Sequence, residues 1–428
     1  MSLHHTFYLR VGSEFFKFLI FIGIFVGLIN YTVAQENYSQ DLVTAFWRSS
    51  PGEPRNNAVE ALINASPDAL TLYRWLQRGP KFSGDVETGV VERLRINKSG
   101  LEMRYVILIP PGYDPTKSYP VEFILHGGVG RNKWQEGETF WRGGYDSLKH
   151  QDKIVVVPAA WNAAYWWQSE QAENLPEILK AVKREYNVDD NRVSMTGVSD
   201  GGTGAYFFAF KQPTPWSTFF PYIGNAAVLR NPQSGGGYRL YFENLRNKPL
   251  FIVNGEKDPL YPVSSVTPFI KVLVEAGVKH EFVPITDGGH NLNWMPDQAD
   301  AIQRFKEENP REPLPDSVQW VADRTDIYNR NHWLRIDSRS ASGSPAVVVA
   351  TRDSNRIVLD TVGVEALTLL ISPDQFDFER PLEVIADGEQ IFVGELMLDE
   401  SVMLDWAAID LDRSMLFAAE LNLKIQSP

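Results

Sequence analysis

The residues best suited to do chemistry lie in the sequence Gly197-Val198-Ser199-Asp200-Gly201, which has the form Gly-x-Ser-x-Gly. Apolar runs on both sides predict a buried strand, a sharp turn at Ser199 and then a buried helix. The two glycines allow the close backbone approach that such a turn needs. The first N–H groups of the helix have no intrahelical partner, so the Asp200 N–H is expected to face a developing oxyanion. A glycine-rich turn without chemistry is the alternative.

Two further positions supply a base and an acid. Asp258 follows an apolar run at 250–253, and His290 follows another at 281–285. Each side chain therefore falls at the carboxyl end of a predicted parallel strand, where ligands gather in open sheets. We expect Ser199, His290 and Asp258 to form a catalytic triad in which the imidazole takes the serine proton. Glu256 is the nearest rival for the acid.

A second backbone donor is expected in the glycine-rich sequence Leu125-His126-Gly127-Gly128-Val129-Gly130. Without side chains at 127 and 128, this backbone can approach an oxyanion from the side opposite Asp200. The predicted donor is the N–H of Gly128 or of Val129.

Tryptophans follow the predicted strands near this edge. Trp134, Trp166 and Trp167 are tentative substrate contacts, because an indole ring can stack on a sugar or on an aryl acyl group. The alternative is that these rings pack as a lid.

The order of elements predicts an α/β fold followed by an all-β unit. Strands alternate with helices over residues 85–308, which predicts a mostly parallel sheet covered by helices on both faces, with an antiparallel hairpin at 90–109. Short apolar runs about ten residues apart predict a β-sandwich at 318–428, after a proline-rich linker at 309–317. Residues 35–84 are expected to be a helical lead-in, with a helix that Ser66 caps.

These motifs resemble those of the secreted α/β-hydrolase esterases, a group that includes feruloyl and acetylxylan esterases and polyhydroxybutyrate depolymerases. Prolyl-oligopeptidase-type hydrolases are close relatives of that group. The resemblance covers about residues 105–305 and implies an α/β-hydrolase fold with its triad in the chain order Ser, Asp, His. Val129 departs from it, because many members carry a third glycine there. The motifs that carry it are 110–115, 120–128, 197–202, 255–258 and 287–290.

Composition excludes several functions. The 428 residues include no cysteine, which rules out disulfides, cysteine-bound zinc, iron–sulfur clusters and a thiol nucleophile. A formal net charge of -13 argues against nucleic acid or an anionic membrane as a partner. No metal or cofactor is expected. The expected partner is a small-molecule or polysaccharide-linked ester, and the oligomeric state is left open.

The N-terminus predicts export. Arg10 and Lys17 precede an apolar run at 18–29, and Thr32-Val33-Ala34 places small residues where a signal peptidase cuts. We expect a signal peptide over 1–34, cleaved after Ala34, and a secreted or periplasmic protein. An uncleaved membrane anchor is the alternative.

Together these features predict an exported serine hydrolase that cleaves carboxylic esters through an acyl-enzyme. A serine peptidase of the prolyl-oligopeptidase kind is the alternative with the same chemistry. A non-catalytic carbohydrate-binding or adhesion protein, in which the C-terminal β unit carries the function, is the alternative from another class.

Overall fold

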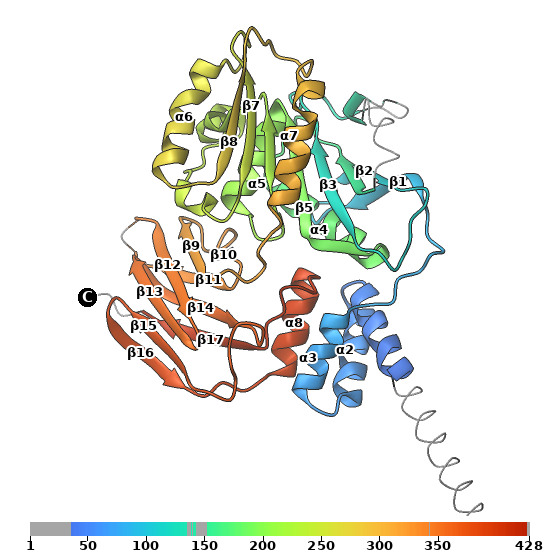
Figure 1. The fold of residues 1–428 in the computed structure, drawn as a ribbon, viewed down its shortest axis with the longest axis vertical. Coiled ribbons are helices and arrows are strands. Elements are labelled where there is room, and N and C mark those ends of the chain that lie inside the picture. The colour runs from blue at the N-terminus through green and yellow to red at the C-terminus, as the bar shows by residue number, and fades with distance from the viewer. Residues whose placement is uncertain (1–35, 135–137, 139, 143–151, 342, 426–428) are drawn as a thin grey trace, which may run out of the picture. The chain divides into compact units, whose positions relative to one another are not determined.

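The computed structural model describes residues 36–425 except 135–137, 139, 143–151 and 342. The predicted signal peptide and its cleavage site lie outside the described residues. The chain divides into two compact units, Met1–Lys81 and Phe82–Pro428 (Figure 1). No helix in the described part of the chain has the length and apolar character needed to cross a membrane.

The first unit is helical in its described part. Residues 36–48 form one helix, followed by α2 (Glu53–Ala65) and α3 (Ala69–Arg78). The prediction that Ser66 caps the third helix is wrong. Asp68 is the N-cap, because its carboxylate accepts the Thr71 N–H at 2.8 Å, while Ser66 ends the preceding helix.

An eight-stranded sheet begins the second unit, in the order β1-β2-β4-β3-β5-β6-β7-β8 (Figure 1). The pairs β1–β2 and β2–β4 are antiparallel, and every neighbour from β4 to β8 is parallel. The predicted parallel sheet with an antiparallel hairpin at its edge is therefore confirmed. The strands are β1 (Gly89–Ile96), β2 (Glu102–Ile109), β3 (Tyr119–Leu125), β4 (Ile154–Pro158), β5 (Val188–Val198), β6 (Phe219–Tyr222), β7 (Leu250–Gly255) and β8 (His280–Ile285).

Helices cover both faces of this sheet. Neighbouring residues of a strand point to opposite faces, so Phe219 and Phe220 belong to different cores. Phe219 shares a core with α4 (Ser169–Glu185) and α5 (Asp200–Lys211), and α6 (Val263–Glu275) packs on that same core. Phe220 shares the other core with α7 (Met295–Glu308). The sheet is thereby buried on both sides, as parallel strands require.

Two smaller sheets follow and share one core. A four-stranded sheet has the order β10-β11-β14-β17, and a five-stranded sheet has the order β16-β15-β13-β12-β9. Trp320 and Val348 of the larger sheet pack with Leu367 and Leu421 of the smaller one. The strands are β9 (Ser317–Ala322), β10 (Arg330–Asn331), β11 (Leu334–Arg339), β12 (Ala346–Asp353), β13 (Arg356–Val362), β14 (Val364–Ile371), β15 (Leu382–Ala386), β16 (Glu389–Gly394) and β17 (Ala419–Lys424).

The expectation of an all-β C-terminal unit is wrong for one segment, because α8 (Glu400–Asp410) is a helix. Asp399 caps it by accepting the N–H groups of Ser401 and Val402. The buried residues of this helix are all apolar: Met403, Leu404, Trp406 and Ala407. A second difference from a simple antiparallel arrangement is that β13 and β15 pair in parallel.

The predicted linker at 309–317 is a packed connection. Arg311 is 5% exposed and donates hydrogen bonds to the Asn191 side chain and to the Thr214 carbonyl. Its guanidinium also pairs with the buried Asp412 at 2.6 Å. A buried ion pair therefore fixes this segment between the large sheet and the C-terminal sheets.

Candidate active site

Ser199 occupies the turn between β5 and α5 in a strained conformation, with φ 57° and ψ -115°. The flanking glycines are sterically required. A Cβ on Gly197 would lie 1.9 Å from the Gly201 carbonyl oxygen, and a Cβ on Gly201 would lie 1.9 Å from the Leu125 carbonyl oxygen. The Gly-x-Ser-x-Gly sequence thus forms the sharp strand-to-helix turn that presents a serine above a sheet edge.

The structure brings Ser199, His290 and Asp258 together in one hydrogen-bonded chain. His290 Nε2 lies 2.8 Å from Ser199 Oγ, and His290 Nδ1 lies 2.7 Å from Asp258 Oδ2. A carboxylate can only accept, so the Nδ1–H donates to Asp258 and Nε2 is left to accept the serine hydroxyl proton. The arrangement can move a proton away from the hydroxyl oxygen as that oxygen attacks.

The acid is held by the backbone around it. The Asp258 side chain is fully buried, and its Oδ1 accepts the N–H groups of Leu260 and Tyr261 at 2.8 and 2.9 Å. The rival Glu256 is exposed and accepts the Asp287 N–H instead. Only Asp258 of these two carboxylates therefore contacts His290 among the described interactions.

The glycine-rich sequence after β3 passes close to Ser199. A Cβ on Gly127 would lie 3.0 Å from Ser199 Cβ and 3.6 Å from its Oγ. Gly128 adopts φ +69°, a left-handed conformation that favours glycine. We call residues 126–130 the glycine loop.

The Val129 N–H is not a suitable oxyanion donor, because it already donates to Asp200 Oδ2 at 2.9 Å. This bond argues against one of the two predicted alternatives. The predicted oxyanion donors are therefore the N–H groups of Gly128 and of Asp200, the first residue of α5. Sequence reasoning did not foresee the bond, since 71 residues separate its partners.

His126 fixes the start of the glycine loop. Its Nε2 accepts the Ala160 N–H at 3.0 Å, and its Nδ1 lies 2.8 Å from the Gly127 carbonyl oxygen. Burial, with a smaller contribution from the positive charge of Arg131, lowers the pKa of His126 to about 4. His126 is therefore a neutral imidazole with its proton on Nδ1.

The three predicted tryptophan contacts, Trp134, Trp166 and Trp167, are buried in the core, which argues against a direct role in substrate binding. Trp166 and Trp167 are 0% and 2% exposed, and their indole N–H groups donate to the carbonyls of His126 and Ser234. Trp134 packs against Trp141 and Trp161. The Trp166 and Trp167 indole N–H groups are thus already bonded within the fold, and buried rings offer little surface to a ligand.

Tyr261 places an aromatic ring beside the base. Its ring meets the His290 imidazole edge-on, with 5.9 Å between centroids. Burial and the nearby negative charges of Asp200 and Asp258 raise the pKa of the Tyr261 phenol. The phenol therefore stays protonated at neutral pH. Sequence reasoning did not single out Tyr261, although it lies only three residues after Asp258.

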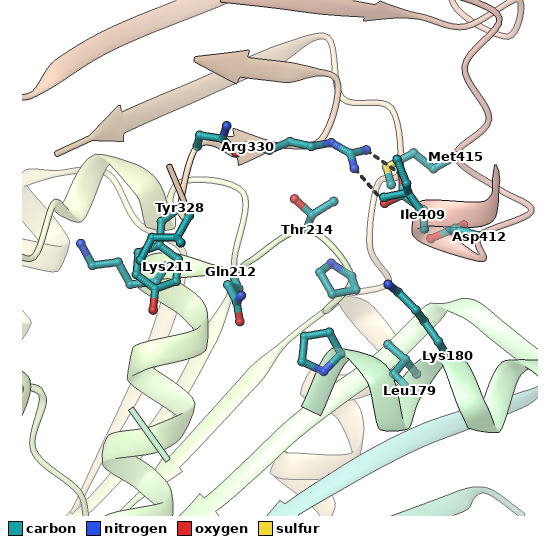
Figure 2. Close-up of a pocket in the computed structure, with 15 residues that line it drawn as sticks. Leu179, Lys180, Lys211, Gln212, Thr214, Tyr328, Arg330, Ile409, Asp412 and Met415 are labelled. Carbon is teal, nitrogen blue, oxygen red and sulfur yellow. Dashed lines mark hydrogen bonds and ion pairs between the residues drawn. The ribbon is translucent and has the colours of Figure 1, made fainter. Parts of the chain in front are cut away.

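A separate cavity of about 220 Å³ lies at the other end of α5, between that helix, α4 and the C-terminal sheets (Figure 2). Its wall includes Leu179, Gln212, Tyr328 and Met415. The charged side chains there are already paired: Lys180 with Glu177, Lys211 with Asp323, Arg330 with Asp410, and Asp412 with Arg311. Within the described residues, no cluster of three or more His, Asp or Glu side chains is placed to hold a metal ion.

No family model matches the chain. It is 26% identical over 231 residues to the bifunctional acetylxylan esterase/xylanase XynS20E of Neocallimastix patriciarum, a match that covers 53% of this chain and 29% of that protein. It is 25% identical over 208 residues to dipeptidyl-peptidase 5 of Porphyromonas gingivalis, covering 46% and 28%. The chain thus spans less than a third of the length of these curated relatives.

Among solved structures, a thermostable esterase matches 52% of this chain and 63% of its own, with 20% identity and a TM-score of 0.40. That likeness is distant. The strand order and the turn at Ser199 instead define an α/β-hydrolase-like fold. The chain therefore has an α/β-hydrolase-like sheet and esterase and peptidase relatives at low identity over about half its length.

Proposed function

We propose that this protein is a serine hydrolase that cleaves carboxylic esters through an acyl-enzyme on Ser199. The observation that carries the proposal is the hydrogen-bonded chain from Ser199 Oγ through His290 to Asp258. A neighbouring glycine loop supports it, because backbone donors near the serine are what a developing oxyanion needs.

The mechanism follows from these contacts. His290 Nε2 takes the hydroxyl proton as Ser199 Oγ attacks the acyl carbon, and Asp258 stabilises the imidazolium that forms. The N–H groups of Asp200 and Gly128 bind the oxyanion of the tetrahedral intermediate. His290 then protonates the departing alcohol. Water repeats the cycle on the acyl-enzyme and releases the acid.

A serine peptidase is the second candidate, since the same triad can cleave amides. The similarity to a dipeptidyl-peptidase favours it, and the similarity to an acetylxylan esterase favours the ester reading. The test compares turnover of p-nitrophenyl acetate with that of proline p-nitroanilide. We expect clear preference for the ester, and preference for the anilide would make the protein a peptidase.

The matched control is Ser199→Ala, which should lower kcat by about 10⁴-fold or more on whichever substrate is used. A folded wild-type protein that turns over neither substrate would favour the non-catalytic binding protein. In that case the C-terminal β unit becomes the first place to look for a ligand, by pull-down on insoluble polysaccharide.

We also propose that the protein acts outside the cytoplasm on a small-molecule or polysaccharide-linked ester. The N-terminal charge, apolar run and Thr32-Val33-Ala34 sequence support export. N-terminal sequencing of the protein recovered from its native host should give Gln35 as the first residue. Recovery of an intact N-terminus in the membrane fraction would instead indicate an anchor.

A further inference from the structure

We propose that the Asp200 carboxylate is a positioning group that ties the glycine loop to the nucleophile turn and so sets the distance between the two oxyanion donors. The inference rests on the proposed function and adds a role for a residue outside the triad. It assigns Asp200 two tasks: its N–H binds the oxyanion, and its side chain holds the other donor in place.

The contact that carries the inference is the bond from the Val129 N–H to Asp200 Oδ2, 2.9 Å long. Val129 is 1% exposed and belongs to the main core, so the loop end that Asp200 holds is itself anchored. A hydrogen bond to a carboxylate is roughly twice as strong as one between neutral groups. The tie is therefore strong, and it joins a buried residue of the glycine loop to the first residue of α5.

The glycine loop has a second anchor at its other end. The carbonyl of His126 accepts the Trp166 indole N–H at 2.9 Å, and the His126 ring accepts the Ala160 N–H. Gly127 and Gly128 lie between these anchors and carry no side chain that could fix them. Glycines have large conformational freedom, so the position of the Gly128 N–H depends on both ends of the loop.

The geometry makes Asp200 the direct link between the donors. Asp200 directly follows the nucleophile Ser199 in the chain. Its carboxylate accepts the N–H of Val129, which directly follows the donor Gly128. Displacing a reacting or stabilising group by about 1 Å can cost 10²-fold in rate. Loss of the tie should therefore reduce stabilisation of the transition state more than it reduces substrate binding.

The charge of Asp200 strengthens the tie, but an uncharged acceptor oxygen is enough to form it. A carboxylate near a developing oxyanion repels it, whereas an amide oxygen can accept the same N–H without that repulsion. Asp200→Asn should therefore keep the tie and Asp200→Ala should lose it. This contrast separates a positioning role from a general need for negative charge at the start of α5.

The experiment measures kcat and KM on p-nitrophenyl acetate for the wild type, Asp200→Asn and Asp200→Ala, with thermal melting of each. The matched control is Asp297→Ala, which removes an exposed carboxylate from the first turn of α7. We expect Asp200→Ala to lose about 10- to 100-fold in kcat with KM changed less than about threefold. We expect Asp200→Asn, which keeps an acceptor oxygen, to recover most of the kcat that Asp200→Ala loses, and we expect the control Asp297→Ala to stay within about threefold of the wild type.

Equal losses in Asp200→Asn and Asp200→Ala would overturn the proposal, because the acceptor would then not be what matters. An unchanged kcat in Asp200→Ala would also overturn it. If Asp200→Ala does not fold, Asp200→Ser takes its place, since its hydroxyl ends one atom short of the carboxylate oxygen. A wild type without esterase activity would contradict the proposed function instead, so the two failures are distinguishable.

Discussion

Two histidines of the site differ in their hydrogen-bond partners, and the partners decide what each ring can do. His290 lies between a hydroxyl and a carboxylate, so it can accept a proton and have the resulting charge stabilised. His126 contacts backbone groups, and its burial keeps it neutral. One ring is placed for proton transfer, and the other supports the glycine loop.

The partly buried His126 makes the stability of the protein depend on pH. Its pKa is about 4 in the folded protein and near 6.5 when exposed, so the unfolded chain binds the proton first as pH falls. The stabilisation is complete above pH 6.5 and is lost toward pH 4, by about 3 kcal/mol at most. Burial also lowers the pKa of His332, which acts in the same direction.

Urea unfolding at pH 7.5 and at pH 4.5 tests this prediction. His126→Gln should lose less free energy of unfolding between the two pH values than the wild type does, because Gln cannot take up the proton. His332→Gln is a second variant with the same expected direction. Identical pH dependence in the wild type and His126→Gln would show that His126 is not the titrating group.

At this scale, the sequence predicted the positions of the side chains that meet, because Ser199, Asp258 and His290 each follow an apolar strand. The sequence did not predict which nearby donors and rings already form contacts within the fold. The Val129 N–H and the indole rings of Trp166 and Trp167 are used within the fold, and burial of that kind depends on segments far away in the chain. Local patterns do not contain this information.

At the scale of elements, the strand-to-helix turn depends on backbone packing at its glycines. An added Cβ at Gly201 would meet the Leu125 carbonyl, which belongs to a central strand and cannot move alone. We expect Gly201→Ala to lower the free energy of unfolding by about 1–3 kcal/mol. Loss of activity should accompany it, since the same shift moves the glycine loop.

The matched control is Gly112→Ala, where an added Cβ meets no atom within 4 Å. Thermal and urea unfolding of both variants measure the difference. A Gly201→Ala protein as stable as Gly112→Ala would mean that β3 and the turn lie further apart than the structure has them.

The same scale shows where sequence patterns succeed and fail. The hairpin β1–β2 was predictable because its two strands are eight residues long and a short turn containing Asn97 and Gly100 separates them. The strand β6 has four buried residues, too few to show a period. Helix α8 was not predicted, because it lies between two short apolar runs, 390–393 and 416–425, that predict strands.

At the scale of the whole molecule, a buried ionic cluster joins the large sheet to the C-terminal sheets. Asp412 pairs with Arg311 and Lys183, and Lys183 also pairs with Asp190. Burial alone would raise the pKa of the Asp412 carboxyl, but the two cations hold it well below its usual range. Asp412 therefore stays charged, and losing a partner is costly.

Arg311→Met tests this cluster. It leaves the buried Asp412 carboxylate with Lys183 as its remaining paired cation, 3.7 Å away, so we expect a loss of about 3 kcal/mol in the free energy of unfolding. Arg324→Met is the control, because Arg324 and Asp326 form an exposed pair that should contribute less than about 1 kcal/mol. Equal effects of the two substitutions in urea unfolding would contradict a structural role for the buried cluster.

The most direct test of the central claim is labelling of the folded protein with a fluorophosphonate, followed by mass spectrometry of the digested chain. The account predicts one adduct on Ser199, and it predicts that His290→Ala strongly slows labelling and that Ser199→Ala abolishes it. A folded wild-type protein that takes up no label, or that carries it on another residue, would contradict the assignment of Ser199 as the nucleophile.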